Sequence, residues 1–305
     1  MIPNEKKFSY KDLKAEAAAL VALIHPLKGK VVKVRPLKGG LTNRNYRLDC
    51  EGERFVLRVM GDNSRLLGIN RVAEHSCLRA AHSIGIGPEV VAFFPEKGAL
   101  VTRFVTGRVL APKALKSSAM LRRIVKSLRR YHEKSDGTGR FSAFETVRHY
   151  YALGRECKVS FPRNITQALD ILDRIEAERG VPDRVCPCHN DLLPSNLVAE
   201  RGKVWIIDWE YGGVGDLFFD LGNLAANNLF DDRQEIQLLE FYFGKARPDD
   251  LRRLRLMRRA SDMREAMWGF LQMGISRLEF DYQTYARHHL ERFLDGAARV
   301  VRNSL

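Results

Sequence analysis

A short polar stretch, CHNDLLPSNLV at residues 188–198, contains side chains of the kinds that move phosphoryl groups. Asp191 could take or orient the proton of an acceptor hydroxyl, because a carboxylate is a suitable general base. Asn196 and the later Asp208 offer hard oxygen ligands, which Mg²⁺ prefers, from two neighbouring loops. The stretch therefore predicts transfer of a phosphoryl group to an alcohol, with Mg²⁺ held against the phosphates.

The spacing of these residues is more specific than their types. His189-x-Asp191-x4-Asn196 has the order of a kinase catalytic loop, in which the Asp acts on the hydroxyl proton and the Asn binds Mg²⁺. Asp208 follows an apolar, strand-like segment, where the second Mg²⁺ ligand is expected. The alternative makes Asp191 a helix N-cap and Asn196 a turn residue. That alternative leaves the repetition of the kinase order unexplained.

The elements that must position these residues form two groups. In residues 1–105, short segments of alternating apolar and polar residues are separated by Gly-containing turns, which predicts an antiparallel sheet with one main helix. An apolar run at 17–24 predicts an amphipathic helix packed on the body rather than a secretory signal. The predicted strands cover 32–35, 45–49, 55–59, 90–94 and 100–105, and the main helix ends near Gly85.

Residues 106–305 show mainly the spacing of helices. The only strand-like segments in this half, 197–199 and 203–207, flank the polar stretch and predict a small hairpin that presents it. The two groups together predict an α+β fold with a strand-rich first lobe and a mostly helical second lobe. The predicted helices lie around 121–131 and at 165–179, 234–243, 250–278 and 283–302.

The first lobe contains candidates for nucleotide binding in the order that a kinase requires. Arg58 on the third strand could neutralise phosphate charge, and Glu74 on the following helix could orient that cation. The alternatives are a simple turn at the glycines, an exposed Arg58, and a Glu74 that pairs with Arg71 or Arg79. The glycine-containing hairpin expected over the phosphates carries Gly39, Gly40, Thr42 and Asn43.

Composition narrows the class of protein. The chain has 305 residues, 45% of them hydrophobic and 29% charged, which is an ordinary globular balance. No apolar stretch approaches the roughly 20 residues needed to span a bilayer, so we expect a cytoplasmic protein without stable membrane insertion. The net charge of +14 suggests an anionic partner, and ATP is one. The densest basic run, at 251–259, predicts a helix with a solvated face.

The five cysteines do not form a metal-binding pattern. Only Cys186 and Cys188 lie close together, and no second pair or ligand cluster is near them in the sequence. We therefore expect reduced cysteines that fill the core.

Beyond the catalytic loop, the chain resembles the choline/ethanolamine kinase family, in the aminoglycoside-phosphotransferase branch of the protein-kinase-like fold. The resemblance runs from about Leu37 to Tyr285. It rests on GGLTNRNYRL, FVLRVMG, GPEVVAFFPEKGALVTRFVTGR, HNDLLPSN, IDWEYGGVGDLFFDLGN and WGFLQMGISRLEFDYQTYA.

The resemblance implies a bilobal protein-kinase-like fold and the phosphorylation of a small amino alcohol by ATP with Mg²⁺. Asp191 would be the base, Asn196 and Asp208 the Mg²⁺ ligands, and Arg58 with Glu74 the phosphate-orienting pair. The adenine would bind the backbone of Arg103, Phe104 and Val105, while Glu210, Asp220 and Asn223 would support the metal and acceptor sites.

The acceptor would be a small cation, choline or ethanolamine first. A quaternary ammonium lacks N–H donors, so aromatic faces and nearby carboxylates suit it. The aromatic set matching the family's pocket is Tyr211, Trp268 and Tyr285, with Asp191 and Glu210 as acidic neighbours. Trp268 and Tyr285 could instead be helix core. The chain departs from the family at Glu265, where a tryptophan is expected, and at Asn227, where an acid is common.

These departures keep other acceptors open, including a thiamine-like cation. An antibiotic phosphotransferase would need a broad acidic pocket with few aromatics. A catalytically silent basic scaffold, binding nucleic acid or acidic membranes, is the non-enzymatic alternative; the retained catalytic residues favour an enzyme with no nucleic-acid partner. The sequence leaves a monomer or a homodimer equally open.

Overall fold

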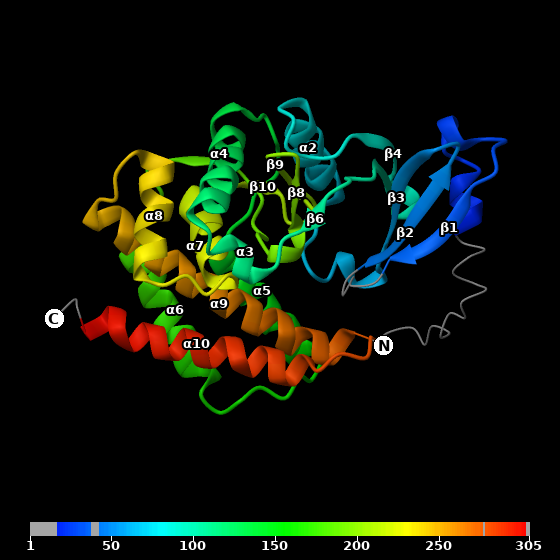
Figure 1. The fold of residues 1–305 in the computed structure, drawn as a ribbon. Helices are drawn as coiled ribbons and strands as arrows, with labels where there is room; N and C mark the ends of the chain where they lie inside the picture. Colours follow the sequence, from blue (N-terminus) through cyan, green and yellow to red (C-terminus); the bar gives the residue numbers. More distant parts are fainter. Residues whose placement is uncertain (1–16, 38–42, 277, 303–305) are drawn as a thin grey trace. The chain divides into compact units, whose positions relative to one another are not determined.

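The computed structural model describes residues 17–37, 43–276 and 278–302 (Figure 1). Contacts divide the chain into two compact units. The first contains the residues up to Ser64 together with Pro88–Val105, and the second contains Arg65–Gly87 and the residues from Thr106 onward. Three residues expected in the phosphate-binding hairpin, Gly39, Gly40 and Thr42, lie outside the described residues.

The first unit is built on one antiparallel sheet with strand order β1-β2-β3-β5-β4. Glu51 and Gly52, both at positive φ, join the second and third strands by a two-residue turn whose twist suits a hairpin. The short helices of this unit are η1 (His25–Leu27), η2 (Asp62–Ser64) and η3 (Pro95–Lys97). Its strands are β1 (Lys33–Leu37), β2 (Asn43–Cys50), β3 (Glu53–Met60), β4 (Val90–Phe94) and β5 (Ala99–Arg103).

The core of the first unit lies on one face of this sheet. Leu48, Phe55 and Leu57 are buried there, because alternate residues of a strand point to the same face. Ile24 packs into the same core, and residues 17–21 are helical, as the apolar run predicted. The predicted meander is therefore confirmed.

The second unit is mostly helical. Its longest helix, α9, packs against α5, α6, α7, α8 and α10, so it forms the centre of the helical part. The helices are α2 (Arg71–Ser83), α3 (Pro112–Leu115), α4 (Ser118–Lys134), α5 (Ala143–Glu156), α6 (Ile165–Arg179), η4 (Pro194–Asn196), α7 (Leu217–Asn227), α8 (Asp232–Phe243), α9 (Pro248–Ile275) and α10 (Tyr282–Arg302). None of these described helices combines the length and apolar character needed to cross a bilayer.

Short strands frame the catalytic loop. The predicted hairpin is present, but the expectation of no further strands in this half was wrong. Two of the additional strands show no clear strand pattern in the sequence, because one contains Pro187 and the other contains two glycines. The two sheets contain β6 (Arg108–Val109), β8 (Leu197–Glu200) and β9 (Lys203–Ile206), and β7 (Val185–Cys188) with β10 (Gly213–Asp216).

Helix α2 belongs to the second unit by its contacts, although its place in the sequence predicted that it would be part of a first lobe of residues 1–105. The Cys77 thiol lies 3.4 Å from the Thr138 carbonyl, and the Tyr131 hydroxyl donates to the Cys77 carbonyl at 3.4 Å. The Ile206 amide donates to the Ile86 carbonyl at 2.8 Å. These bonds tie the segment after the third strand to the helical unit.

Candidate active site

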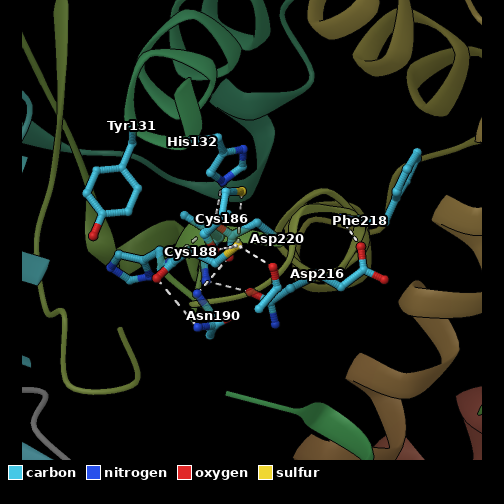
Figure 2. A network of polar contacts seen from close by, with 12 residues as sticks. Tyr131, His132, Cys186, Cys188, Asn190, Asp216, Phe218 and Asp220 are labelled. Atoms are coloured by element: carbon cyan, nitrogen blue, oxygen red, sulfur yellow. Dashed lines mark hydrogen bonds and ion pairs between the residues drawn. The ribbon is translucent and has the colours of Figure 1, made fainter. Parts of the chain in front are cut away.

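The catalytic loop is fixed to helix α7 by a buried carboxylate (Figure 2). Asp220 accepts the backbone amides of His189 at 2.8 Å and Asn190 at 2.6 Å. Nε2 of His132 lies 3.0 Å from the same carboxylate. Burial raises the pKa of Asp220, but the hydrogen bond from His132 and the other donors outweigh it and hold the pKa below its usual range. The ionised carboxylate therefore orders the start of the loop.

Asn223, one turn further along α7, holds the next part of the loop. Its side-chain oxygen accepts the Leu192 amide at 2.5 Å, and its side-chain nitrogen donates to the Ser261 hydroxyl at 2.9 Å. Asn190 adopts a left-handed conformation (φ 64°), which Asn tolerates better than most residues, and donates to the Tyr211 carbonyl at 2.9 Å. The predicted supporting role of α7 thus has a physical basis in these bonds.

His189 joins the loop to the segment that carries Asp208. Its Nδ1 accepts the Asp191 amide at 3.2 Å, so Nε2 carries the hydrogen donated to the Ile207 carbonyl at 3.0 Å. Burial lowers the pKa of His189, which keeps the ring neutral. This histidine positions the loop without touching the carboxylate of Asp191.

The structure brings Asp191 and Asn196 into contact. The Asn196 amide nitrogen donates to the Asp191 carbonyl at 2.9 Å and to its carboxylate at 3.3 Å. The Ile207 amide donates to the Asn196 carbonyl at 2.9 Å, which places Asp208 (φ 63°) next to this loop. Because the Asn196 nitrogen is the donor, its side-chain oxygen remains as a ligand atom. An amide oxygen with a carboxylate suits Mg²⁺.

Arg264 is a buried site residue that sequence analysis missed. Its Nη2 donates to Asp191 Oδ1 at 2.7 Å and forms an ion pair with Glu265. The guanidinium also lies over the ring of Tyr211, 4.9 Å from its centre. Burial raises the pKa of Asp191 to about 7, against the opposing effect of Arg264. A charged pair within the apolar middle of α9 was the signal that could have identified it.

Two of the three predicted acceptor aromatics lie against each other. The rings of Trp268 and Tyr285 meet edge to face, with centres 5.6 Å apart. The Tyr285 hydroxyl donates to Glu265 Oε2 at 2.6 Å. Tyr211 is buried, and its hydroxyl lies 3.5 Å from that of Tyr150. Arg264 and Glu265 connect this aromatic group to Asp191.

Glu74 forms an ion pair with Arg71, which is one of the two alternative partners that the sequence offered. Arg71 Nη1 lies 2.7 Å from Glu74 Oε2 and 3.5 Å from Glu210 Oε2. Both carboxylates are almost fully buried. Arg58 belongs to the first unit and Glu74 to the second, so their pairing stays a prediction.

The remaining nucleotide candidates are described within the first unit. Asn43 begins β2 and Arg58 lies on β3, and both are buried. Arg103 pairs with Glu89 at 3.1 Å and with a second acid, Glu53. Beyond β5, the backbone continues through Phe104 and Val105, and the Phe104 amide donates to the Arg54 carbonyl at 2.9 Å.

A group of possible metal ligands lies next to Asp220, the residue that holds the catalytic loop. Ligand atoms of His132, Cys186 and Cys188 lie within 4.8 Å of one another, and Figure 2 shows them around Asp220. Both nitrogens of His132 are engaged, since Nδ1 lies 2.7 Å from the Tyr242 hydroxyl and Nε2 bonds the carboxylate. His132 therefore helps to hold Asp220, and Cys186 and Cys188 are buried in strand β7 beside it.

A cavity of about 430 Å³ in the second unit is lined by other residues. It is lined mainly by apolar side chains around the ion pair of Arg179 with Asp216, whose charged atoms are 2.7 Å apart. None of the predicted site residues is among the described residues that line it. Its walls offer no carboxylate and amide set like that of the catalytic loop.

Comparison with known proteins gives consistent results. Residues 33–257 match the phosphotransferase enzyme family. Protein LicA of Haemophilus influenzae is 32% identical over 213 residues, which cover 67% of this chain and 61% of LicA, less than two thirds of its length. Mouse ethanolamine kinase 2 is 24% identical over 308 residues, covering 90% of this chain and 79% of that protein.

Solved structures agree on the fold. A choline/ethanolamine kinase family protein from Mesorhizobium loti is 27% identical, with a TM-score of 0.78 over 94% of this chain and 99% of that one. Choline kinase LicA from Streptococcus pneumoniae is 21% identical, with a TM-score of 0.79 over 94% and 99%. The α+β, protein-kinase-like fold class is thereby confirmed. Since the family match spans most of the chain and includes the whole catalytic loop, the chain belongs to the phosphotransferase enzyme family.

Proposed function

We propose that the protein transfers the γ-phosphoryl group of ATP to the hydroxyl of a small amino alcohol, with choline and ethanolamine as the first candidates. The observation that carries the proposal is the buried carboxylate of Asp191, held by Asn196 and Arg264 beside Asp208. Relatives named choline and ethanolamine kinases support the substrate class.

In this proposal Asp191 acts on the acceptor. The carboxylate accepts or orients the hydroxyl proton while the alcohol oxygen attacks the γ-phosphorus and ADP leaves on the opposite side. The bonds from Arg264 and Asn196 fix the orientation of the carboxylate, so no reorganisation is needed during the reaction.

Mg²⁺ fits the oxygen donors of Asn196 and Asp208, which would hold it in this proposal. When bound, the ion neutralises charge on the phosphates of the nucleotide. The phosphates would also contact the hairpin at Gly39, Gly40, Thr42 and Asn43, and Arg58, oriented by Glu74. The adenine would bind the backbone of Arg103, Phe104 and Val105.

The acceptor would bind in the second unit, beside Asp191. Glu210 supplies a buried carboxylate, Trp268 and Tyr285 supply aromatic surface, and Tyr211 lies beside them with one face under the Arg264 guanidinium. This arrangement suits a small organic cation better than a large polycation, since aromatic rings and few carboxylates surround it.

Replacement of Asp191 by Asn tests the assignment. We expect kcat for the preferred amino alcohol to fall by at least about 100-fold, because the neutral amide cannot accept the proton. ADP release and ³¹P NMR of the phosphoester would measure turnover. The control Asp170→Asn changes an exposed acid on α6 and should leave turnover unaltered. Equal turnover in the two variants would refute the role of Asp191.

A further inference from the structure

We propose that the Arg264–Glu265 pair makes the acceptor site select an ammonium group that carries N–H donors over a fully methylated quaternary ammonium. This inference rests on the proposed function, because it assumes an amino-alcohol acceptor. It concerns two neighbouring residues of α9, one of which was expected from the family resemblance to be a tryptophan.

Arg264 already occupies one face of the Tyr211 ring. Its guanidinium lies 4.9 Å from the centre of the Tyr211 ring, and the side chain is only 2% exposed. Asp191 and Glu265 hold it there through charged contacts. A ring face covered by one cation cannot also stabilise a second one. The face of Tyr211 that Arg264 covers is therefore not open to a second cation.

The other two aromatic residues do not complete a cage. Trp268 and Tyr285 present an edge to a face, with ring planes at 73°, so part of each surface is used in their mutual contact. His289 lies against Tyr285, with ring centres 4.6 Å apart. A cage for a quaternary ammonium needs several ring faces directed at one point. The rings of Trp268 and Tyr285 instead meet each other, Tyr282 and Phe280 edge to face, so part of their surface is used within this described group.

Glu265 provides a hydrogen-bond acceptor in place of a ring. Its Oε2 accepts the Tyr285 hydroxyl at 2.6 Å, and each carboxylate oxygen has two lone pairs. Burial raises the pKa of Glu265, but Arg264 and the other neighbours outweigh it and hold the pKa below its usual range. An ionised carboxylate forms strong, charge-assisted bonds with N–H donors. A quaternary ammonium has no N–H donor and cannot form such a bond.

A methylation series separates the two kinds of recognition. Ethanolamine, N-methylethanolamine, N,N-dimethylethanolamine and choline share one hydroxyl and one chain length but carry three, two, one and no N–H groups when protonated. We expect kcat/KM to fall along this series by at least about tenfold in total, since a site built to bind N–H groups rejects analogues that lack them. ADP release and ³¹P NMR of the products would measure it.

Variants of the pair test its cause. Glu265→Gln should raise KM for ethanolamine by a larger factor than it changes kcat. The control Glu291→Gln replaces an exposed acid on α10 and should leave KM and kcat unaltered. The double change Arg264→Leu with Glu265→Trp should raise the ratio of choline to ethanolamine kcat/KM by at least about tenfold. A raised ratio cannot result from partial unfolding, because unfolding lowers both rates equally.

The outcomes distinguish the inference from the proposed function. A kcat/KM that stays level or rises with methylation, or an unaltered ratio in the double variant, would overturn the selectivity assigned to the pair and leave the kinase activity standing. Phosphorylation of none of the four alcohols by an enzyme that binds Mg-ATP would overturn the proposed function itself.

Discussion

Asp220 shows how one buried side chain can organise a catalytic loop. It has no solvent exposure and accepts two backbone amides and His132. Removing a carboxylate of this kind leaves several buried donors without an acceptor. We predict that Asp220→Ala lowers the free energy of unfolding by about 3–5 kcal/mol, as for other broken buried pairs. Urea denaturation followed by circular dichroism would measure it.

The matched control is Asp232→Ala, which removes a carboxylate that is 88% exposed and paired with Arg255 at 2.7 Å. Surface pairs contribute about 0–1 kcal/mol, so this variant should remain close to wild type. Equal unfolding free energies in the two variants would contradict the role given to Asp220.

Among individual residues, the sequence predicted part of the candidate site. Asp191, Asn196 and Asp208 could be proposed as site residues from the sequence because their spacing lies within one short segment. Arg264 could not, because its contact with Asp191 spans 73 residues and depends on how α9 packs. Glu265 was noticed as a departure, but its bond to Tyr285 could not be read from the pattern.

Helices α7 and α9 pack so closely that one glycine is required between them. A Cβ at Gly222 would lie 2.6 Å from the Arg258 nitrogen and 2.7 Å from the Met257 carbonyl carbon, both backbone atoms. Gly222→Ala must therefore separate the helices and strain the bond from Asn223 to Ser261. We predict a loss of about 1–3 kcal/mol in unfolding free energy, as in other overpacked cores, together with lower turnover.

Gly154→Ala in α5 is the comparison for this prediction. There the added Cβ would meet Phe161 Cζ at 2.6 Å, which is a side-chain atom rather than the backbone of a packed helix. Thermal unfolding of both variants measures the difference. A smaller effect at Gly222 than at Gly154 would show that the approach of the two helices is not the constraint.

Two of the elements that the sequence missed, α7 and β10, lack a visible period, whereas α5, which it also missed, alternates buried and exposed residues. Residues Leu217–Ala226 of α7 are all buried, so this helix has no polar face and no amphipathic period. Strand β10 reads GVGD, with too few side chains to show alternation. The long helices α6 and α10 were predicted because exposed polar residues alternate with buried ones along each of them, whereas Ala260–Gln272 of α9 are all buried and that helix was predicted from the spacing of its earlier turns.

At the scale of the whole molecule, much of the basic charge is used internally. The arginine-rich run on α9 forms pairs with acids of other helices and loops: Arg252 with Glu178 at 2.9 Å and Arg253 with Asp183 at 2.8 Å. We predicted a solvated face for this run, and several of its arginines in fact form ion pairs. A net charge of +14 alone is a weak argument for a nucleic-acid partner when its densest segment is neutralised within the fold.

Glu235 is the centre of this neutralisation, since its side chain is 2% exposed and pairs with Arg255 at 2.8 Å and with Arg258 at 2.5 Å. We predict that Glu235→Gln lowers the unfolding free energy by about 1.5–3 kcal/mol, the range for hydrogen bonds to charged groups. It should also elute from heparin at higher salt, because two guanidiniums are released. Glu240→Gln makes the same change in net charge at an exposed position and serves as the control. If both variants elute at the same salt concentration, the internal pairing does not limit anion binding.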